Sequence, residues 1–190
     1  LFEKADDIVI AGEGTTADEV VEFISSNEVD IVILDINLPD KNGFEVLEHI
    51  KRVRGQIKVL VLSMYPEESY GVRVMRAGAS GYLNKEKSSH ELLQAIRIIA
   101  DGRKYVGPVL AEKLAEEFDK KTAEGGKITL SNREFEVLVM YAKGASQAEI
   151  ACALSVSTGT VSTYRSRRMK KLGVSTNAEL IMYAVKNNLL

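Results

Sequence analysis

A carboxylate, a hydroxyl and an ammonium group each end an apolar run of this 190-residue chain. Asp35 ends the run at residues 30–35, Ser63 ends residues 58–63, and Lys85 ends residues 81–85. Apolar runs of this length are typical of buried strands, and open parallel sheets carry their sites at the carboxyl ends of the strands. We therefore expect the three side chains to share one pocket.

This set of groups suits phosphoryl transfer to a carboxylate. An aspartate nucleophile needs a cation that stabilises the developing charge, either a lysine or a divalent metal. The acyl phosphate carries about two negative charges, which a nearby hydroxyl can sense. Taken singly, Asp35 can be a loop cap, and Ser63 and Lys85 can be ordinary polar residues at strand ends. Their joint occurrence favours a site.

The segments around these runs have helical periodicity. Capping boxes open helices at residues 16–19 and 88–91, and residues 44–53 repeat the same apolar spacing. A further strand is expected at residues 7–12. Alternating strands and helices indicate an α/β doubly wound parallel-sheet domain. His49 and His90 have no partners at metal-ligand spacing, so we interpret both as surface or capping residues.

Residues 34–39 with Gly43, residues 61–63 and residues 78–85 together resemble the receiver domain of bacterial two-component response regulators. The resemblance implies that Asp35 accepts a phosphoryl group from a histidine kinase. It implies that Ser63 is the switch hydroxyl, that Tyr82 changes rotamer on activation, and that Lys85 holds the phosphoryl oxygens. It also implies Mg²⁺ as a cofactor.

The chain departs from the receiver pattern at its start. The family begins with a strand that ends in two acidic residues, whereas residues 1–4 resemble the end of the first helix. Asp6 and Asp7 precede a strand and do not replace that pair. With an initial leucine, we expect a fragment without the first strand and most of the first helix. Its metal site is then incomplete, with Asp35 and the Asn37 carbonyl as protein ligands.

The charge is unevenly distributed along the chain. Residues 1–105 carry net charge −5, residues 106–126 carry −2, and residues 127–190 carry +5. We predict a receiver domain at 1–105, a linker at 106–126 with a short helix at 108–121 and a flexible stretch at 122–126, and a third region at 127–190. The basic third region points to a nucleic-acid partner.

The C-terminal region has no strand pattern and several signals that start or end helices. Helices are expected at residues 130–144, 146–154, 158–172 and 177–188. Two short helices joined by a tight turn form a helix-turn-helix. Residues 130–134, 149–151, 160–164 and 171–174 resemble the LuxR-type DNA-binding domain of NarL/FixJ response regulators, which implies an all-α domain.

The helix at 158–172 has two different sides. At 100° per residue, Val161, Tyr164 and Leu172 share a core-like side, while small hydroxyl residues occupy the other. The hydroxyl side suits the major groove, and the cations suit DNA phosphates. The predicted DNA-binding residues are Thr158, Thr160, Ser162, Thr163, Arg165, Ser166, Arg167, Lys170 and Lys171.

Two single residues carry separate expectations. Arg168 lies on the core-like side, where the family usually has an apolar residue. We expect its stem to lie along the core while its guanidinium reaches out to a phosphate or an acidic neighbour. Cys152 is expected to be a small buried apolar group. No disulfide can form within the chain, and no signal peptide or membrane-spanning run is apparent, which indicates a cytoplasmic protein.

Together these features predict a non-enzymatic transcription factor that phosphorylation controls. Its expected partners are a histidine kinase, DNA with paired half-sites, and a second copy of the chain. One alternative is a constitutive DNA-binding protein whose degenerate receiver serves only assembly. Another is an aspartyl-nucleophile phosphatase. Enzymes of that kind resemble a pattern with a second acidic residue two positions after the nucleophile, and this chain has Asn37 there.

Overall fold

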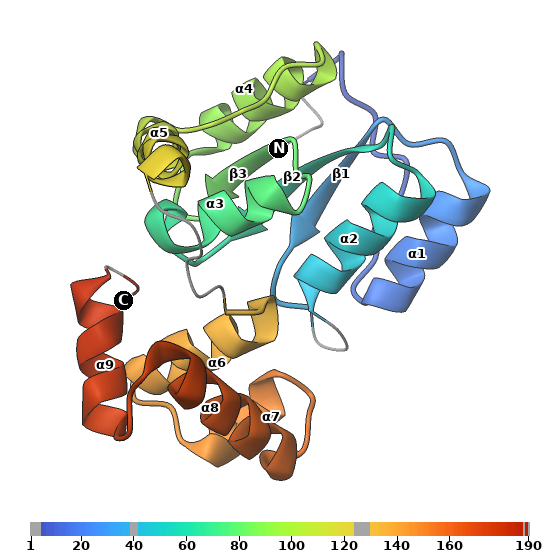
Figure 1. The fold of residues 1–190 in the computed structure, drawn as a ribbon. Helices are drawn as coiled ribbons and strands as arrows, with labels where there is room; N and C mark the ends of the chain where they lie inside the picture. The colour runs from blue at the N-terminus through green and yellow to red at the C-terminus, as the bar shows by residue number, and fades with distance from the viewer. Residues whose placement is uncertain (1–4, 39–41, 124–129, 188, 190) are drawn as a thin grey trace. The chain divides into compact units, whose positions relative to one another are not determined.

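The computed structural model describes residues 5–38, 42–123, 130–187 and 189. The chain divides into two compact units, residues 1–67 with 74–107 and residues 68–73 with 108–190 (Figure 1). The predicted receiver region falls largely in the first unit and the predicted helical region in the second. Residues 1–4, expected to resemble a helix end, lie outside the described residues, as do residues 124–126 of the expected flexible stretch.

The receiver region alternates helices and strands, as its periodicity predicts. Its elements are α1 (Ala17–Ser26), β1 (Ile31–Asp35), α2 (Gly43–Val53), β2 (Lys58–Ser63), α3 (Glu67–Arg76), β3 (Gly81–Asn84) and α4 (Ser89–Ala100). Capping boxes formed by Thr16 with Glu19 and by Ser88 with Glu91 begin α1 and α4. These boxes satisfy backbone N–H groups that the first helical turn leaves without partners.

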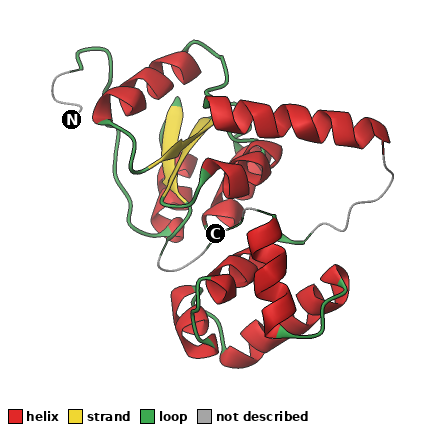
Figure 2. Ribbon diagram, turned by 90° about the vertical axis from the view of Figure 1, so that its left-hand side faces the viewer, coloured by secondary structure: helices red, strands yellow, loops and turns green. Residues whose placement is uncertain are grey.

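The three strands form one parallel sheet in the order β1-β2-β3. Figure 2 shows the strands in yellow among the helices of the receiver region. Asp35 pairs in register with Leu62, and Ser63 pairs with Asn84. Helix α4 packs against all three strands, and Leu60 and Leu83 belong to the core that it covers. Successive strand residues point to opposite faces, so the fully buried Val59 and Val61 are covered from the other side. The predicted parallel-sheet class is confirmed.

The strand predicted at residues 7–12 does not form. In the structure Ile8 packs against the α4 core, but Val9 is 88% exposed and Ile10 is 52% exposed. The apolar residue types predict a strand, but a strand also needs a hydrogen-bonding neighbour. The described residues provide no such neighbour beside residues 7–12, and the segment is irregular.

Helix α3 was not predicted. The segment contains Gly71 and several charged side chains, which obscure an apolar stripe. The parallel connection between β2 and β3 nevertheless requires a crossover, and crossovers in such sheets are usually helical. Topology would have predicted α3 where periodicity did not.

The second unit is helical, and the expected helix-turn-helix is present. Its helices are α5 (Pro108–Ala123), α6 (Asn132–Ala142), α7 (Gln147–Ala153), α8 (Thr158–Leu172) and α9 (Asn177–Lys186). Ser131, Ser146 and Thr176 form capping boxes at the starts of α6, α7 and α9. Gly173 ends α8 with φ 66°, a left-handed conformation that favours glycine.

The core of the helix-turn-helix comes from three helices. Val137 of α6, Ile150 of α7 and Val161 of α8 are fully buried against one another. Cys152 does not join them, because its side chain is exposed. The prediction of a buried cysteine was therefore wrong. Helix α7 is short and only one of its faces is covered, and Cys152 lies outside that face.

Gly43 lies against the backbone of Asp35 and Ile36. Its N–H donates to the Ile36 carbonyl at 3.0 Å, and an added Cβ would lie 2.5 Å from the Ile36 Cα and 2.6 Å from the Asp35 carbonyl oxygen. Both obstacles are backbone, so a side chain requires the loop to move. The close approach of α2 to Asp35 and Ile36 therefore depends on glycine at this position.

We predict that Gly43→Ala lowers the free energy of unfolding by about 1–3 kcal/mol through overpacking. The matched control is Gly159→Ala in α8, whose methyl group would meet only the Ser157 Oγ at 3.6 Å. Denaturant unfolding should show a loss for Gly43→Ala and none for the control. Equal stability of the two variants would contradict the tight loop.

Candidate functional site

Asp35, Ser63 and Lys85 lie at the same edge of the sheet. Asp35 ends β1, Ser63 ends β2, and Lys85 follows β3 directly. The Lys85 N–H donates to the Ser63 carbonyl at 2.9 Å, which extends the strand pairing by one residue. The parallel register therefore brings together three residues that are far apart in the sequence.

The Asp35 carboxylate directly contacts the Lys85 ammonium group. Lys85 Nζ donates to Asp35 Oδ2, and the Asn37 N–H donates to Oδ1 at 2.9 Å. The two charged side chains remain partly accessible, with 30% of the Asp35 side chain and 36% of the Lys85 side chain exposed. A reagent in solvent can thus reach a carboxylate that already has a cation beside it.

Ser63 and Tyr82 are fully buried at this edge. Ser63 Oγ accepts a hydrogen bond from the Tyr65 N–H at 3.1 Å, while the Tyr82 hydroxyl donates to the Tyr65 carbonyl at 2.7 Å. Asn84 Nδ2 donates to that carbonyl as well, at 3.2 Å. Sequence reasoning missed Tyr65, because its contribution is made by backbone atoms that carry no residue-type signal.

The described residues do not by themselves form a magnesium site. Mg²⁺ prefers six oxygen ligands in octahedral geometry. Here one carboxylate is available, both of its oxygens are already hydrogen-bonded, and Asn37 adds at most its backbone carbonyl. Within residues 5–38, 42–123 and 130–187, no three His, Cys, Asp or Glu side chains gather as metal ligands do.

Helix α8 presents its hydroxyl side to solvent, as predicted. Thr158, Ser162, Thr163 and Ser166 are exposed, and Thr160 is half-buried. Three of these hydroxyls have partners: Ser162 Oγ accepts from Gln147 Nε2 at 3.0 Å, Thr163 Oγ1 donates to the Gly159 carbonyl at 3.0 Å, and Thr160 Oγ1 is hydrogen-bonded to Ser157 Oγ at 2.8 Å. The core side of the helix faces inward at Val161.

The predicted phosphate-binding cations of α8 are of two kinds. Arg167 and Lys170 are exposed. Arg165 and Lys171 are held within the unit: the Arg165 guanidinium donates twice to Asn177 Oδ1, at 3.0 and 2.8 Å, and Lys171 Nζ donates to Glu134 Oε2 at 2.6 Å. Lys171 must therefore exchange a partner before it can bind a phosphate.

Glu134 is a buried carboxylate that stays ionised. Burial by itself raises its pKa, but the hydrogen bonds from the Lys171 ammonium and the Ser131 N–H outweigh burial and leave the pKa below the usual value of 4.5. The hydrogen bond from the Ser131 N–H to Glu134 Oε2 is 2.8 Å long and belongs to the capping box of α6. Glu134 thus stabilises a helix start and holds a cation of α8.

Arg168 does not reach solvent, so the prediction that its guanidinium snorkels outward was wrong. The residue is fully buried, and none of its three guanidinium nitrogens has a hydrogen-bond partner among the described residues. Its guanidinium carbon lies 5.2 Å from the centroid of the Tyr141 ring. Burial lowers the pKa of Arg168 to about 10.

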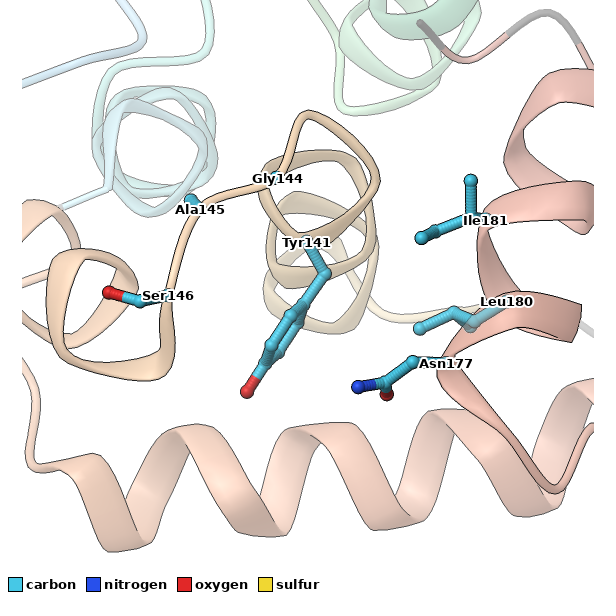
Figure 3. Close-up of a pocket in the computed structure, with 7 residues that line it drawn as sticks. All are labelled: Tyr141, Gly144, Ala145, Ser146, Asn177, Leu180 and Ile181. Carbon is cyan, nitrogen blue, oxygen red and sulfur yellow. The ribbon is translucent and has the colours of Figure 1, made fainter.

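A pocket of about 290 Å³ lies beside Tyr141 in the second unit (Figure 3). Its other lining residues come from the α6–α7 turn and from α9: Gly144, Ala145, Ser146, Asn177, Leu180 and Ile181. Figure 3 labels Tyr141 of α6 and Asn177 of α9 among the residues that line the pocket. Tyr141 and Asn177 are also the residues that contact Arg168 and Arg165. The pocket therefore borders the partners of two α8 arginines.

No helix within the described part of the chain combines the length and apolarity needed to cross a membrane.

Comparisons with known proteins match both halves of the chain. Residues 1–97 match the response regulator receiver domain, and residues 128–184 match the bacterial regulatory proteins of the luxR family. Response regulator UvrY of Escherichia coli (strain K12) is 30% identical over 190 residues, covering 100% of this chain and 87% of UvrY. Transcriptional regulatory protein DesR of Bacillus subtilis (strain 168) is 35% identical over 181 residues, covering 95% of this chain and 85% of DesR.

A solved structure also matches. It is RcsB from Salmonella enterica serovar Typhimurium bound to promoter rprA in the presence of the phosphomimetic BeF3−, with TM-score 0.61 and 25% identity, covering 96% of this chain and 88% of RcsB.

The fold and the matches define a two-component response regulator with a receiver domain and a LuxR-type helix-turn-helix domain. The chain belongs to the NarL/FixJ family of these regulators. It is thus a DNA-binding response regulator that controls transcription, and not an enzyme, which confirms both resemblances and removes the phosphatase alternative. Receiver domains typically use Mg²⁺.

We predict that Glu134→Gln lowers the free energy of unfolding by about 1–3 kcal/mol near neutral pH, because the buried Lys171 pair is lost. The pKa of Glu134 is depressed on folding, so its contribution is full above the usual value of 4.5 and disappears as pH falls through the folded value. Unfolding measured between neutral and acidic pH should show wild type losing more stability on acidification than Glu134→Gln. Glu112→Gln, an exposed control, should follow wild type. Parallel curves for wild type and Glu134→Gln would contradict the pair.

We also predict that Arg168→Leu raises the free energy of unfolding, by about 1–4 kcal/mol, because an unpaired buried charge is replaced by apolar volume. Denaturant unfolding of the full chain measures the effect. The control Arg167→Leu removes an exposed cation and should change stability by less than about 0.5 kcal/mol. A large fall in the melting temperature of Arg168→Leu would refute the unpaired charge.

Proposed function

We propose that phosphorylation of Asp35 by a histidine kinase switches the DNA binding of this regulator. The observation that carries the proposal is the contact between Asp35 and Lys85 at the sheet edge that also holds Ser63. In the transfer, an Asp35 carboxylate oxygen forms a bond to phosphorus as the bond to the histidine nitrogen breaks. The electron pair stays on that nitrogen, which takes up a proton.

Lys85 is the residue best placed to stabilise the phosphoryl group. Its ammonium already contacts the nucleophilic carboxylate, so it needs little movement to reach the new oxygens. The product adds negative charge at the sheet edge that holds a buried hydroxyl, Ser63 Oγ, which accepts a hydrogen bond from the Tyr65 N–H. Ser63 turning toward the phosphoryl oxygens releases that N–H and so loosens the segment that Tyr82 and Asn84 also bind.

The proposed readout is binding of α8 in the major groove of DNA. The exposed hydroxyls Thr158, Ser162, Thr163 and Ser166, with the half-buried Thr160, support base contacts, and Arg165, Arg167, Lys170 and Lys171 support phosphate contacts. RcsB, which shares the fold, is described as bound to a promoter. We further propose that the protein acts in the cytoplasm, where promoter DNA and a kinase are both available.

A homodimer on paired half-sites completes the proposal. Helix α9 exposes three large apolar side chains, with Ile181 39%, Met182 67% and Val185 51% exposed. Such side chains on one short helix support a contact with a second copy. The domain limits that we propose are 1–105, 106–126 and 127–190.

One experiment tests the switch. The purified chain is incubated with a small acyl phosphate, with and without Mg²⁺, and intact mass and DNA affinity are measured on the same samples. We expect a mass gain of one phosphoryl group in wild type and in Asp30→Ala, an exposed aspartate before β1, but none in Asp35→Ala. DNA affinity should change only in the samples that gain mass.

Two results would refute the proposal. A mass gain that persists in Asp35→Ala places the phosphoryl group elsewhere. Unchanged DNA affinity after modification, or no modification of wild type under any condition, favours the constitutive DNA-binding alternative, in which the receiver serves only assembly.

A further inference from the structure

Two cations of α8 lie on the side that faces α6. Lys171 is bound to the Glu134 carboxylate of α6, and Arg168 lies over the ring of Tyr141 of α6. The two residues are three positions apart and therefore neighbours on one helix face. Glu134 and Tyr141 are seven residues, about two helical turns, apart on α6.

The pair formed by Lys171 and Glu134 leaves Arg168, the more deeply buried of the two cations, without a hydrogen-bond partner among the described residues. Lys171 is 42% exposed and could be solvated, yet it holds the buried Glu134. Arg168 is fully buried and has no hydrogen bond among the described residues. A buried guanidinium without a partner is costly, whereas an exposed ammonium is well hydrated.

Glu134 is the acid whose charge acts on Arg168. Burial lowers the pKa of the Arg168 guanidinium, and the Glu134 carboxylate opposes that shift. Glu134 binds Lys171, which lies one helical turn from Arg168 on the same face of α8. A carboxylate accepts two parallel hydrogen bonds from a guanidinium, a geometry that an ammonium cannot match. Glu134 is therefore a better partner for Arg168 than the Tyr141 ring.

We propose that Glu134 exchanges Lys171 for Arg168 when α8 binds DNA. Lys171 then contacts a backbone phosphate, and Arg168 forms the buried pair that Lys171 leaves. Arg168 is a positioning residue in this scheme, because it keeps Glu134 neutralised while Lys171 is released. The inference rests on the proposed binding of α8 to DNA.

The exchange makes the phosphate contact of Lys171 conditional on Arg168. Without Arg168, the release of Lys171 leaves Glu134 buried and unpaired, so Lys171 stays bound inside the domain. The exposed Lys170 has no such dependence and is the matched control. The scheme predicts coupling between residues 168 and 171 and none between 168 and 170.

The test measures binding of the full chain to a duplex selected with the wild-type protein, as a function of salt. Each neutralised phosphate contributes about 0.9 to the slope of log affinity against log salt. We expect Lys171→Gln to reduce the slope by about 1 in the wild-type background and to have almost no effect in the Arg168→Leu background. Lys170→Gln should have the same effect in both backgrounds.

Further variants separate positioning from a merely structural role. Arg168→Leu should weaken DNA binding although it stabilises the fold, and Arg168→Lys should restore part of the affinity. Adding Glu134→Gln to Arg168→Leu frees Lys171, so Lys171→Gln should again reduce the slope.

Equal effects of Lys171→Gln in the wild-type and Arg168→Leu backgrounds would overturn the exchange while leaving DNA binding intact. Unchanged affinity of Arg168→Leu would overturn it as well. Wild-type protein that selects no duplex would overturn the proposed DNA binding itself, and the exchange with it.

Discussion

The contact between the Asp35 carboxylate and the Lys85 ammonium is the interaction on which the receiver region depends. It exists because β1, β2 and β3 run parallel and in register, so that their carboxyl ends meet at one edge. Any slip in register would move the cation away from the acid. The glycine loop after Asp35 and the backbone of Tyr65 complete the same edge. The chemistry is thus a consequence of sheet geometry.

Several cations of the helical region are less available to a ligand than the sequence alone indicates, because other residues of the domain already hold or bury them. The net charge of +5 over residues 127–190 gives the region its attraction for nucleic acid. Yet Arg165 and Lys171 are held by Asn177 and Glu134, and Arg168 is buried. Binding to phosphates therefore competes with contacts inside the domain.

Sequence reasoning predicted what residue type and spacing determine. Capping residues such as Thr16 and Ser131 mark helix starts because their side chains bind local N–H groups. Strand-end residues such as Asp35 and Lys85 could be placed at one edge because parallel strands align. The exposed hydroxyl side of α8 followed from helical geometry.

The errors have a common cause, which is that burial and pairing depend on distant parts of the chain. Residues 7–12 have strand composition but no neighbouring strand among the described residues, and Cys152 is apolar but lies on an uncovered face. Arg168 could reach solvent by its length alone, yet the structure packs it against Tyr141. The roles of Ser63, Tyr82 and Lys85 remain predictions, because position alone does not establish them.

The most direct test of the account is to locate the acyl phosphate itself. Borohydride reduces an aspartyl phosphate to homoserine, and peptide sequencing by mass spectrometry then identifies the modified position. After incubation with a phosphorylated histidine kinase, the account predicts homoserine at residue 35. Homoserine at another position, or none under conditions that alter DNA binding, would contradict it.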